Sequence, residues 1–214
     1  MLWVTAWTAL IQGDRDAALE HLDECTTIAT ALGDDRLRAH ADHWRGIHAV
    51  FSGDPADSIR LFHDAIAVHR SVGDTASMLT ASFELGMAQT YDGRLDDALR
   101  TCHEVITLSD THGEKWNKAY ALWVSSVAYF HLGRSGDAVE AAQQALRIQR
   151  DFKDKICTAL SIEVLSWVAT SSGDANAAAT LSGAAKGVWH RLGTSVAAFG
   201  PHVTEDSLTS EREA

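Results

Sequence analysis

The chain has 214 residues, and 46% of them are hydrophobic, a proportion that is ordinary for a folded domain and disfavours disorder. Its formal charge is −11, with 18 Lys and Arg against 29 Asp and Glu, so we expect no direct contact with nucleic acid. Three widely separated cysteines, with no Cys-x-x-Cys pair, favour reduced thiols and a cytoplasmic location.

The first eleven residues are apolar, but they lack the basic start of a signal peptide. Trp7 instead aligns, at intervals of 40 residues, with Ile47, Met87, Val127 and Trp167. We therefore predict that residues 1–11 are the second half of a first helix and that the sequence comes from a longer chain. No apolar run has the length of a membrane span, so no membrane association is expected.

Glycines divide the rest of the chain at regular intervals. One series repeats every 40 residues and comprises Gly13, Gly53, Gly93, Gly133 and Gly173. A second series lies 20 residues out of phase and comprises Gly33, Gly73, Gly113 and Gly193, with Lys153 at the remaining place. Two interleaved series at half the period predict a repeated unit of two helices, each closed by a turn.

The second unit shows how such a turn is built. Residues 37–51 have apolar and small side chains at helical spacing. Gly53 follows this helix and can adopt the left-handed conformation that ends it. Asp54 can cap the next helix, and Pro55 suits the first turn of that helix. Arg94 and Arg134 stand at the place of Asp54 in the next two units, so those turns keep the glycine and lose the acidic cap.

Small residues recur where the two helices of a unit must approach closely. Seven residues before each glycine of the first series, the chain has Ala6, Gly46, Gly86, Ser126 and Ser166. Five residues after each of these glycines, it has Ala18, Ser58, Ala98, Ala138 and Ala178. The pattern resembles the tetratricopeptide repeat, which has a small residue, then a glycine, then an alanine at these spacings. The period of 40 in place of about 34, and the missing proline between repeats, depart from that family.

The end of the chain carries a second resemblance. The segments AAATLSGAA (177–185), WHRLGTS (189–195) and FGPH (199–202) are similar to the end of the helical-repeat region in actinobacterial LuxR-family regulators that carry an ATPase module. In that family a nucleotide-binding module precedes the repeats, and a DNA-binding helix-turn-helix follows them. The resemblance implies that this segment senses an effector or binds a protein, while attached ATPase and DNA-binding modules respond.

We predict an all-α, right-handed superhelical solenoid of about five antiparallel hairpins over residues 1–196, with the first hairpin incomplete. The predicted breaks between units lie near Gly33, Gly73, Gly113 and Lys153. Residues 197–214 are expected to form a flexible tail or the start of a linker. Apolar residues at the uncapped first end, including Leu2 and Trp3, predict association into a homodimer or docking to another module.

Aromatic residues recur on the first helix of each unit, which lines the concave face of such arrays. One column contains Trp3, His43, Phe83, Trp123 and Glu163, and neighbouring columns add His40, Tyr120 and Phe130. Two interpretations remain open. Either these side chains pack between neighbouring helices, or they line a groove that binds a protein partner or a small effector such as a sugar.

No motif indicates catalysis, a cofactor or a metal. His40 and His43 share a helix face, and His63 and His103 occupy equivalent positions, but a metal site usually needs three or four converging ligands. The chain has no phosphate-binding loop and no His-Glu-x-x-His motif. We therefore predict a non-catalytic, effector-sensing or protein-interaction module of a LuxR-type regulator. A general scaffold for protein–protein interaction, unrelated to transcription, is the alternative.

Overall fold

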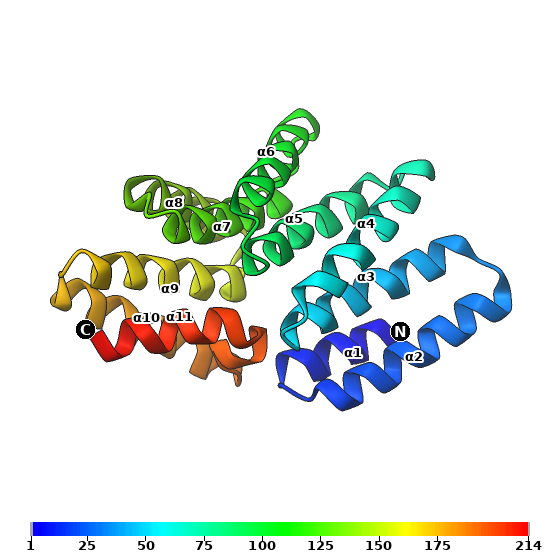
Figure 1. The fold of residues 1–214 in the computed structure, drawn as a ribbon, viewed down its shortest axis with the longest axis horizontal. Coiled ribbons are helices and arrows are strands. Elements are labelled where there is room, and N and C mark those ends of the chain that lie inside the picture. Colours follow the sequence, from blue (N-terminus) through cyan, green and yellow to red (C-terminus); the bar gives the residue numbers. More distant parts are fainter. Residues whose placement is uncertain (1, 214) are drawn as a thin grey trace.

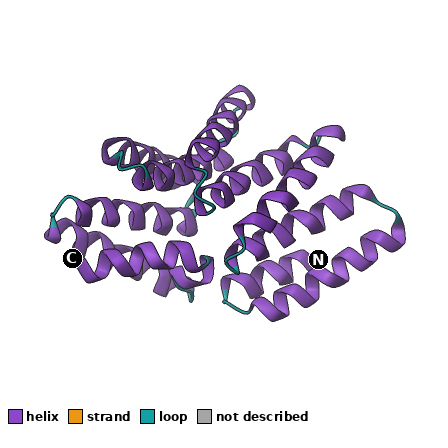
Figure 2. Cartoon of the chain, in the orientation of Figure 1, coloured by secondary structure: helices purple, strands orange, loops and turns teal. Residues whose placement is uncertain are grey.

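The computed structural model describes residues 2–213, which form a row of helical hairpins (Figure 1) without any strand in that range (Figure 2). The ten helices of the hairpins are α1 (Leu2–Ile11), α2 (Arg15–Leu32), α3 (Asp35–Phe51), α4 (Pro55–Ser71), α5 (Thr75–Tyr91), α6 (Leu95–His112), α7 (Trp116–His131), α8 (Ser135–Phe152), α9 (Lys155–Ser171) and α10 (Ala175–Leu192). A 3-10 helix, η1 (Val196–Phe199), and α11 (Pro201–Glu213) follow them. The predicted all-α repeat solenoid is confirmed. Within residues 2–213, every helix is too short or too polar to cross a bilayer.

The turns fall where the glycine series predicted them. Gly53 has a φ of 88°, in the left-handed region, and Lys153, at the place without a glycine, has a φ of 57°. Oδ1 of Asp54 accepts a hydrogen bond of 3.0 Å from the backbone N–H of Asp57 and so caps α4. Arg94 forms no such side-chain cap for α6. The local chemistry of each turn therefore follows the sequence pattern.

The helices α1, α3, α5, α7 and α9, here called the inner helices, contact one another in succession and lie on the concave side of the row. Besides the contacts within each hairpin, α5 contacts α7, and α7 contacts α9. The two columns of small residues are buried where the helices of a hairpin meet. A Cβ atom on Gly46 would lie 2.9 Å from the ring of Phe62. Small side chains at these positions therefore set how closely the helices pack.

Residues 197–213 correct the prediction of a flexible tail or linker. They form the end of η1 and then α11, which packs against α9. Nε1 of Trp167 donates a hydrogen bond of 3.2 Å to Oγ of Ser207, and the hydroxyls of Thr170 and Ser210 lie 2.7 Å apart. Each pair is separated by 40 residues, the repeat period. α11 therefore continues the inner layer, in the register of a further unit.

The two ends of the row meet. The hydroxyl of Thr194 donates a hydrogen bond to the carbonyl of Ile11, and the rings of Phe51 and Phe199 are 5.4 Å apart. In Figure 1 the start of α11 lies next to α1 and α2. The row therefore curves until its last segment touches its first hairpins. Self-association through the first end stays a prediction; Val4, on α1, is 44% exposed.

Candidate functional site

A cavity of about 450 Å³ lies on the concave face of the row. Side chains from all five inner helices line it, and Phe199 of η1 contributes from the closing segment. Most of the lining is aromatic or aliphatic. Apart from the aromatic rings, its polar members are Thr80, Glu84 and Asp154, and no Lys, Arg or His within residues 2–213 lines it.

Three tryptophans form one wall of the cavity. Trp3 of α1 stacks on Trp44 of α3 with ring centroids 5.3 Å apart, and Trp7 lies 5.6 Å from the same indole. Nε1 of Trp44 donates a hydrogen bond of 3.3 Å to Nε2 of His40. Burial, assisted by the neighbouring His43, lowers the pKa of His40 to about 4. The His40 ring is therefore neutral at pH 7 and can accept this bond, which fixes the orientation of Trp44.

A second aromatic wall comes from α5 and α7. Phe83 stacks on Tyr120 at 5.0 Å, and Trp116 lies 4.6 Å from Tyr120. Oδ2 of Asp154 accepts hydrogen bonds from Nε1 of Trp116 at 2.9 Å and from the hydroxyl of Tyr120 at 3.0 Å. Its Oδ1 accepts from the first amides of α9, so both carboxylate oxygens are used. Nε1 of Trp123 is buried without a hydrogen-bond partner in the described part of the chain.

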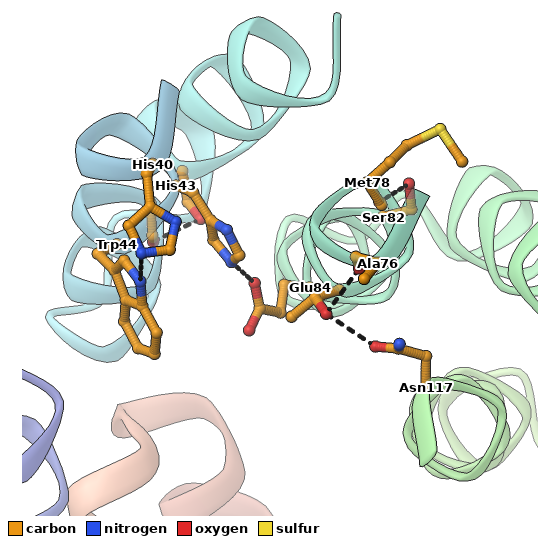
Figure 3. Close-up of polar contacts among 11 residues, drawn as sticks. His40, His43, Trp44, Ala76, Met78, Ser82, Glu84 and Asn117 are labelled. Carbon is orange, nitrogen blue, oxygen red and sulfur yellow. Dashed lines mark hydrogen bonds and ion pairs between the residues drawn. The ribbon is translucent and has the colours of Figure 1, made fainter. Parts of the chain in front are cut away.

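Glu84 links the two walls. Its Oε2 is paired with Nε2 of His43 (Figure 3), and both side chains are buried. His43 in turn stacks on Trp44 with ring centroids 5.6 Å apart. Burial raises the pKa of Glu84, and His43 opposes that rise. Oε1 of Glu84 has no hydrogen-bond partner between residues 2 and 213. Because Glu84 lines the cavity, this oxygen can accept a hydrogen bond from a ligand there.

Six of the eight residues predicted for the concave site lie at or directly behind the cavity. The lining includes Trp3, Phe83, Tyr120 and Trp123. Trp123 is only 2% exposed, so it packs between helices and also borders the cavity. Binding of a partner or effector by the aromatic column stays a prediction. His40 and His43 lie behind the wall, where they contact Trp44 and Glu84.

The other two predicted residues lie outside the cavity lining. The ring of Phe130 is 5.6 Å from that of Trp167. Glu163 accepts hydrogen bonds from Nε1 of Trp189 at 3.0 Å and from Oγ of Ser207 at 2.9 Å. Burial raises the pKa of Glu163, and these two bonds oppose the rise. Both oxygens of Glu163 therefore serve the packing of α9 with α10 and α11.

Sequence reasoning missed several residues of the site, among them Trp44, Glu84, Trp116 and Asp154. A signal existed for two of them, since a column at the repeat period reads Val4, Trp44, Glu84, Val124 and Val164. A single acidic residue in an otherwise apolar column of the inner helices indicates a buried carboxylate with a specific polar partner. Trp116 and Asp154 had no such signal, because the first has no aromatic counterpart and the second repeats an ordinary helix cap.

The arrangement suits binding of a small molecule with an apolar body. The lining offers aromatic faces and one free carboxylate oxygen, that of Glu84. Within the described residues, no group of three His, Cys, Asp or Glu could hold a metal ion.

Known proteins were compared with the chain by family, by sequence and by structure. Residues 76–151 match the family described as tetratricopeptide repeat, and residues 5–47 and 43–88 match the one described as anaphase-promoting complex subunit 5. Crystal structures of a Podosopora anserina putative kinesin light chain with nearly identical TPR-like repeats, one of them of a variant, are similar with TM-scores of 0.61 and 0.60. In both cases 17% of residues are identical over 89% of this chain and 94% of the other, which shows a shared fold alone. No curated protein matches the chain.

Proposed function

From the premise that the chain is a TPR-like helical repeat region, we propose that it is the effector-sensing module of a cytoplasmic, LuxR-type transcriptional regulator and is not itself catalytic. The similarity of residues 177–202 to the end of the repeat region in such regulators supports this context. ATPase and DNA-binding modules of the same protein would carry out the response. A general protein-interaction scaffold is the alternative, since TPR-like repeats typically bind proteins.

The observation that carries the proposal is the cavity. Its volume of about 450 Å³ lies in the range of about 300–1,000 Å³ that small-molecule sites occupy. All five inner helices contribute to its lining, so a ligand that fills the cavity would contact every hairpin. A ligand that fits one curvature of the row better than others would shift the population toward that curvature.

The meeting of the two ends favours a small molecule over an extended peptide. Phe199 packs against Phe51 where the first and last segments touch. A long peptide in the concave face would have to separate these segments, whereas a small effector would not. A helix of a partner protein is therefore the less favoured occupant.

A screen of sugars, nucleotides and aromatic metabolites tests the proposal, with thermal denaturation and tryptophan fluorescence as readouts. A ligand present at 100 times its Kd stabilises the folded state by about 2.7 kcal/mol, so Tm should rise with concentration. Trp3→Ala should weaken binding about three- to tenfold, because a cavity-lining ring is lost. Since Trp3 is 37% exposed, the variant should remain folded.

Phe152→Ala is the matched control. Phe152 is a 47% exposed aromatic residue at the end of α8 and outside the cavity lining, so its loss should leave binding unchanged. An affinity that is equal in the Trp3→Ala variant and the unsubstituted chain would contradict the proposal. So would a screen in which no compound raises Tm or changes the fluorescence.

A further inference from the structure

We infer that the effector is an organic ammonium cation with an apolar body. The inference rests on the proposed function, because it names the class of molecule that the cavity would take. Three features carry it: the sign of the charge in the lining, the free oxygen of Glu84 and the aromatic rings that line the same cavity.

The charged groups of the lining are all acidic. Glu84 and Asp154 are its charged side chains, and none of the Lys and Arg side chains between residues 2 and 213 joins them. Both oxygens of Asp154 already accept hydrogen bonds, one from two aromatic side chains and the other from amides of α9. Glu84 is therefore the charged group that can bind a ligand. The lining, within the described residues, has no positive side chain that could pair with an anionic ligand.

Only one of the two carboxylate oxygens of Glu84 has a hydrogen-bond partner among residues 2–213. Oε2 is paired with His43, whereas Oε1 faces the cavity without a partner in the described residues. An ammonium N–H in the cavity would donate a charge-assisted hydrogen bond to this oxygen. The positive charge would also favour the ionised carboxylate and so oppose the effect of burial, which raises the pKa of Glu84. A neutral hydroxyl could donate one hydrogen bond, but it would stabilise the negative charge less than a cation would.

Aromatic rings flank Glu84 along the inner helices. Trp44 stacks on His43, the partner of Glu84, and the preceding residue, Phe83, stacks on Tyr120. A cation within about 6 Å of an aromatic face gains about 0.5–2 kcal/mol. The same rings can bury an apolar body. Carboxylate and rings together thus favour a molecule that is cationic at one end and apolar at the other.

Calorimetric titration of the 214-residue chain with three matched ligands tests the inference. The ligands are 2-phenylethylammonium, neutral 2-phenylethanol and anionic 3-phenylpropionate. We expect the ammonium to bind at least about tenfold more tightly than the alcohol, and the carboxylate to bind most weakly. Equal affinities for ammonium and alcohol, or a preference for the carboxylate, would overturn the inference. The proposed function would survive that result, since a ligand would still occupy the cavity. If none of the three binds, the inference also fails, and the wider effector screen decides the proposed function separately.

Two variants locate the charge preference. Glu84→Gln keeps the shape of the side chain and removes its charge, so the affinity for the ammonium should fall about tenfold while the alcohol binds as before. Retained alcohol binding also shows that the variant is folded. Glu163→Gln removes a second buried carboxylate, one outside the lining, and should leave both affinities unchanged. An unchanged ammonium affinity in Glu84→Gln, or an equal loss in Glu163→Gln, would overturn the inference. The comparison of the three ligands on the unsubstituted chain does not depend on the folding of either variant.

Discussion

Gly86 shows, at the scale of one residue, how tightly the two helices of a hairpin are packed. A Cβ atom there would lie 2.8 Å from Sγ of Cys102, which is buried. Gly86→Ala should therefore lower the free energy of unfolding by about 1–3 kcal/mol, measured by urea denaturation. Gly183→Ala is the control: Gly183 lies inside α10, and apart from the backbone of its own helix and its chain neighbours no atom lies within 4 Å of an added Cβ. Because alanine favours helix, that variant should gain about 0.5–1 kcal/mol. A loss of similar size in both variants would contradict this account of the packing.

The residues of the cavity also show what spacing can and cannot predict. Trp3, Phe83 and Trp123 follow one column, and since the period of the repeat places equivalent residues on one face, their shared location was predictable. Asp154 was not, because its role depends on Trp116 and Tyr120, which reach it from a different hairpin. The pairing of side chains across hairpins is a tertiary property that a single sequence does not display.

Among the structural elements, the turn before α9 differs from the other turns between hairpins, because it has Lys153 where they have a glycine. Lys153 adopts a φ of 57°, where residues with a Cβ atom are strained by about 1–2 kcal/mol. Lys153→Gly should raise the free energy of unfolding by about 1 kcal/mol or less, since the greater freedom of glycine in the unfolded chain offsets part of the gain. Lys155→Gly, an exposed residue in the first turn of α9, should instead lose up to about 1 kcal/mol. Chemical denaturation of both variants checks the difference in sign, and a loss of stability in Lys153→Gly would rule this explanation out.

The elements themselves were predictable to different degrees. The hairpin breaks depend on a backbone conformation that glycine favours, so local sequence was enough to place them. α11 was missed because its position depends on distant partners: Ser207 and Ser210 bond to Trp167 and Thr170 one period earlier. Val203 and Leu208 are the only large aliphatic side chains of α11, and they do not form an apolar stripe from which a packed helix could be expected.

For the whole molecule, Phe199 is one of the side chains that join the last segment to the first hairpins. Its ring lies 5.4 Å from Phe51 and 5.1 Å from Trp189. Phe199→Ala should lower stability by up to about 3–5 kcal/mol and speed hydrogen exchange in α1 and α11 more than in α6. Leu208→Ala, which removes a 50% exposed side chain of α11, should change neither. Faster exchange of equal size in every helix would show that Phe199 does not act at this junction.

The bond from Thr194 to Ile11 spans 183 residues in a molecule whose hairpins otherwise pack chiefly on their neighbours. In an open array, terminal repeats can melt first, because each unit depends only on the adjacent one. Contacts between the first and last units couple the two ends, so fraying at one of them also breaks contacts of the other. This protein should therefore lose its structure in one concerted transition, unlike a linear array of the same length.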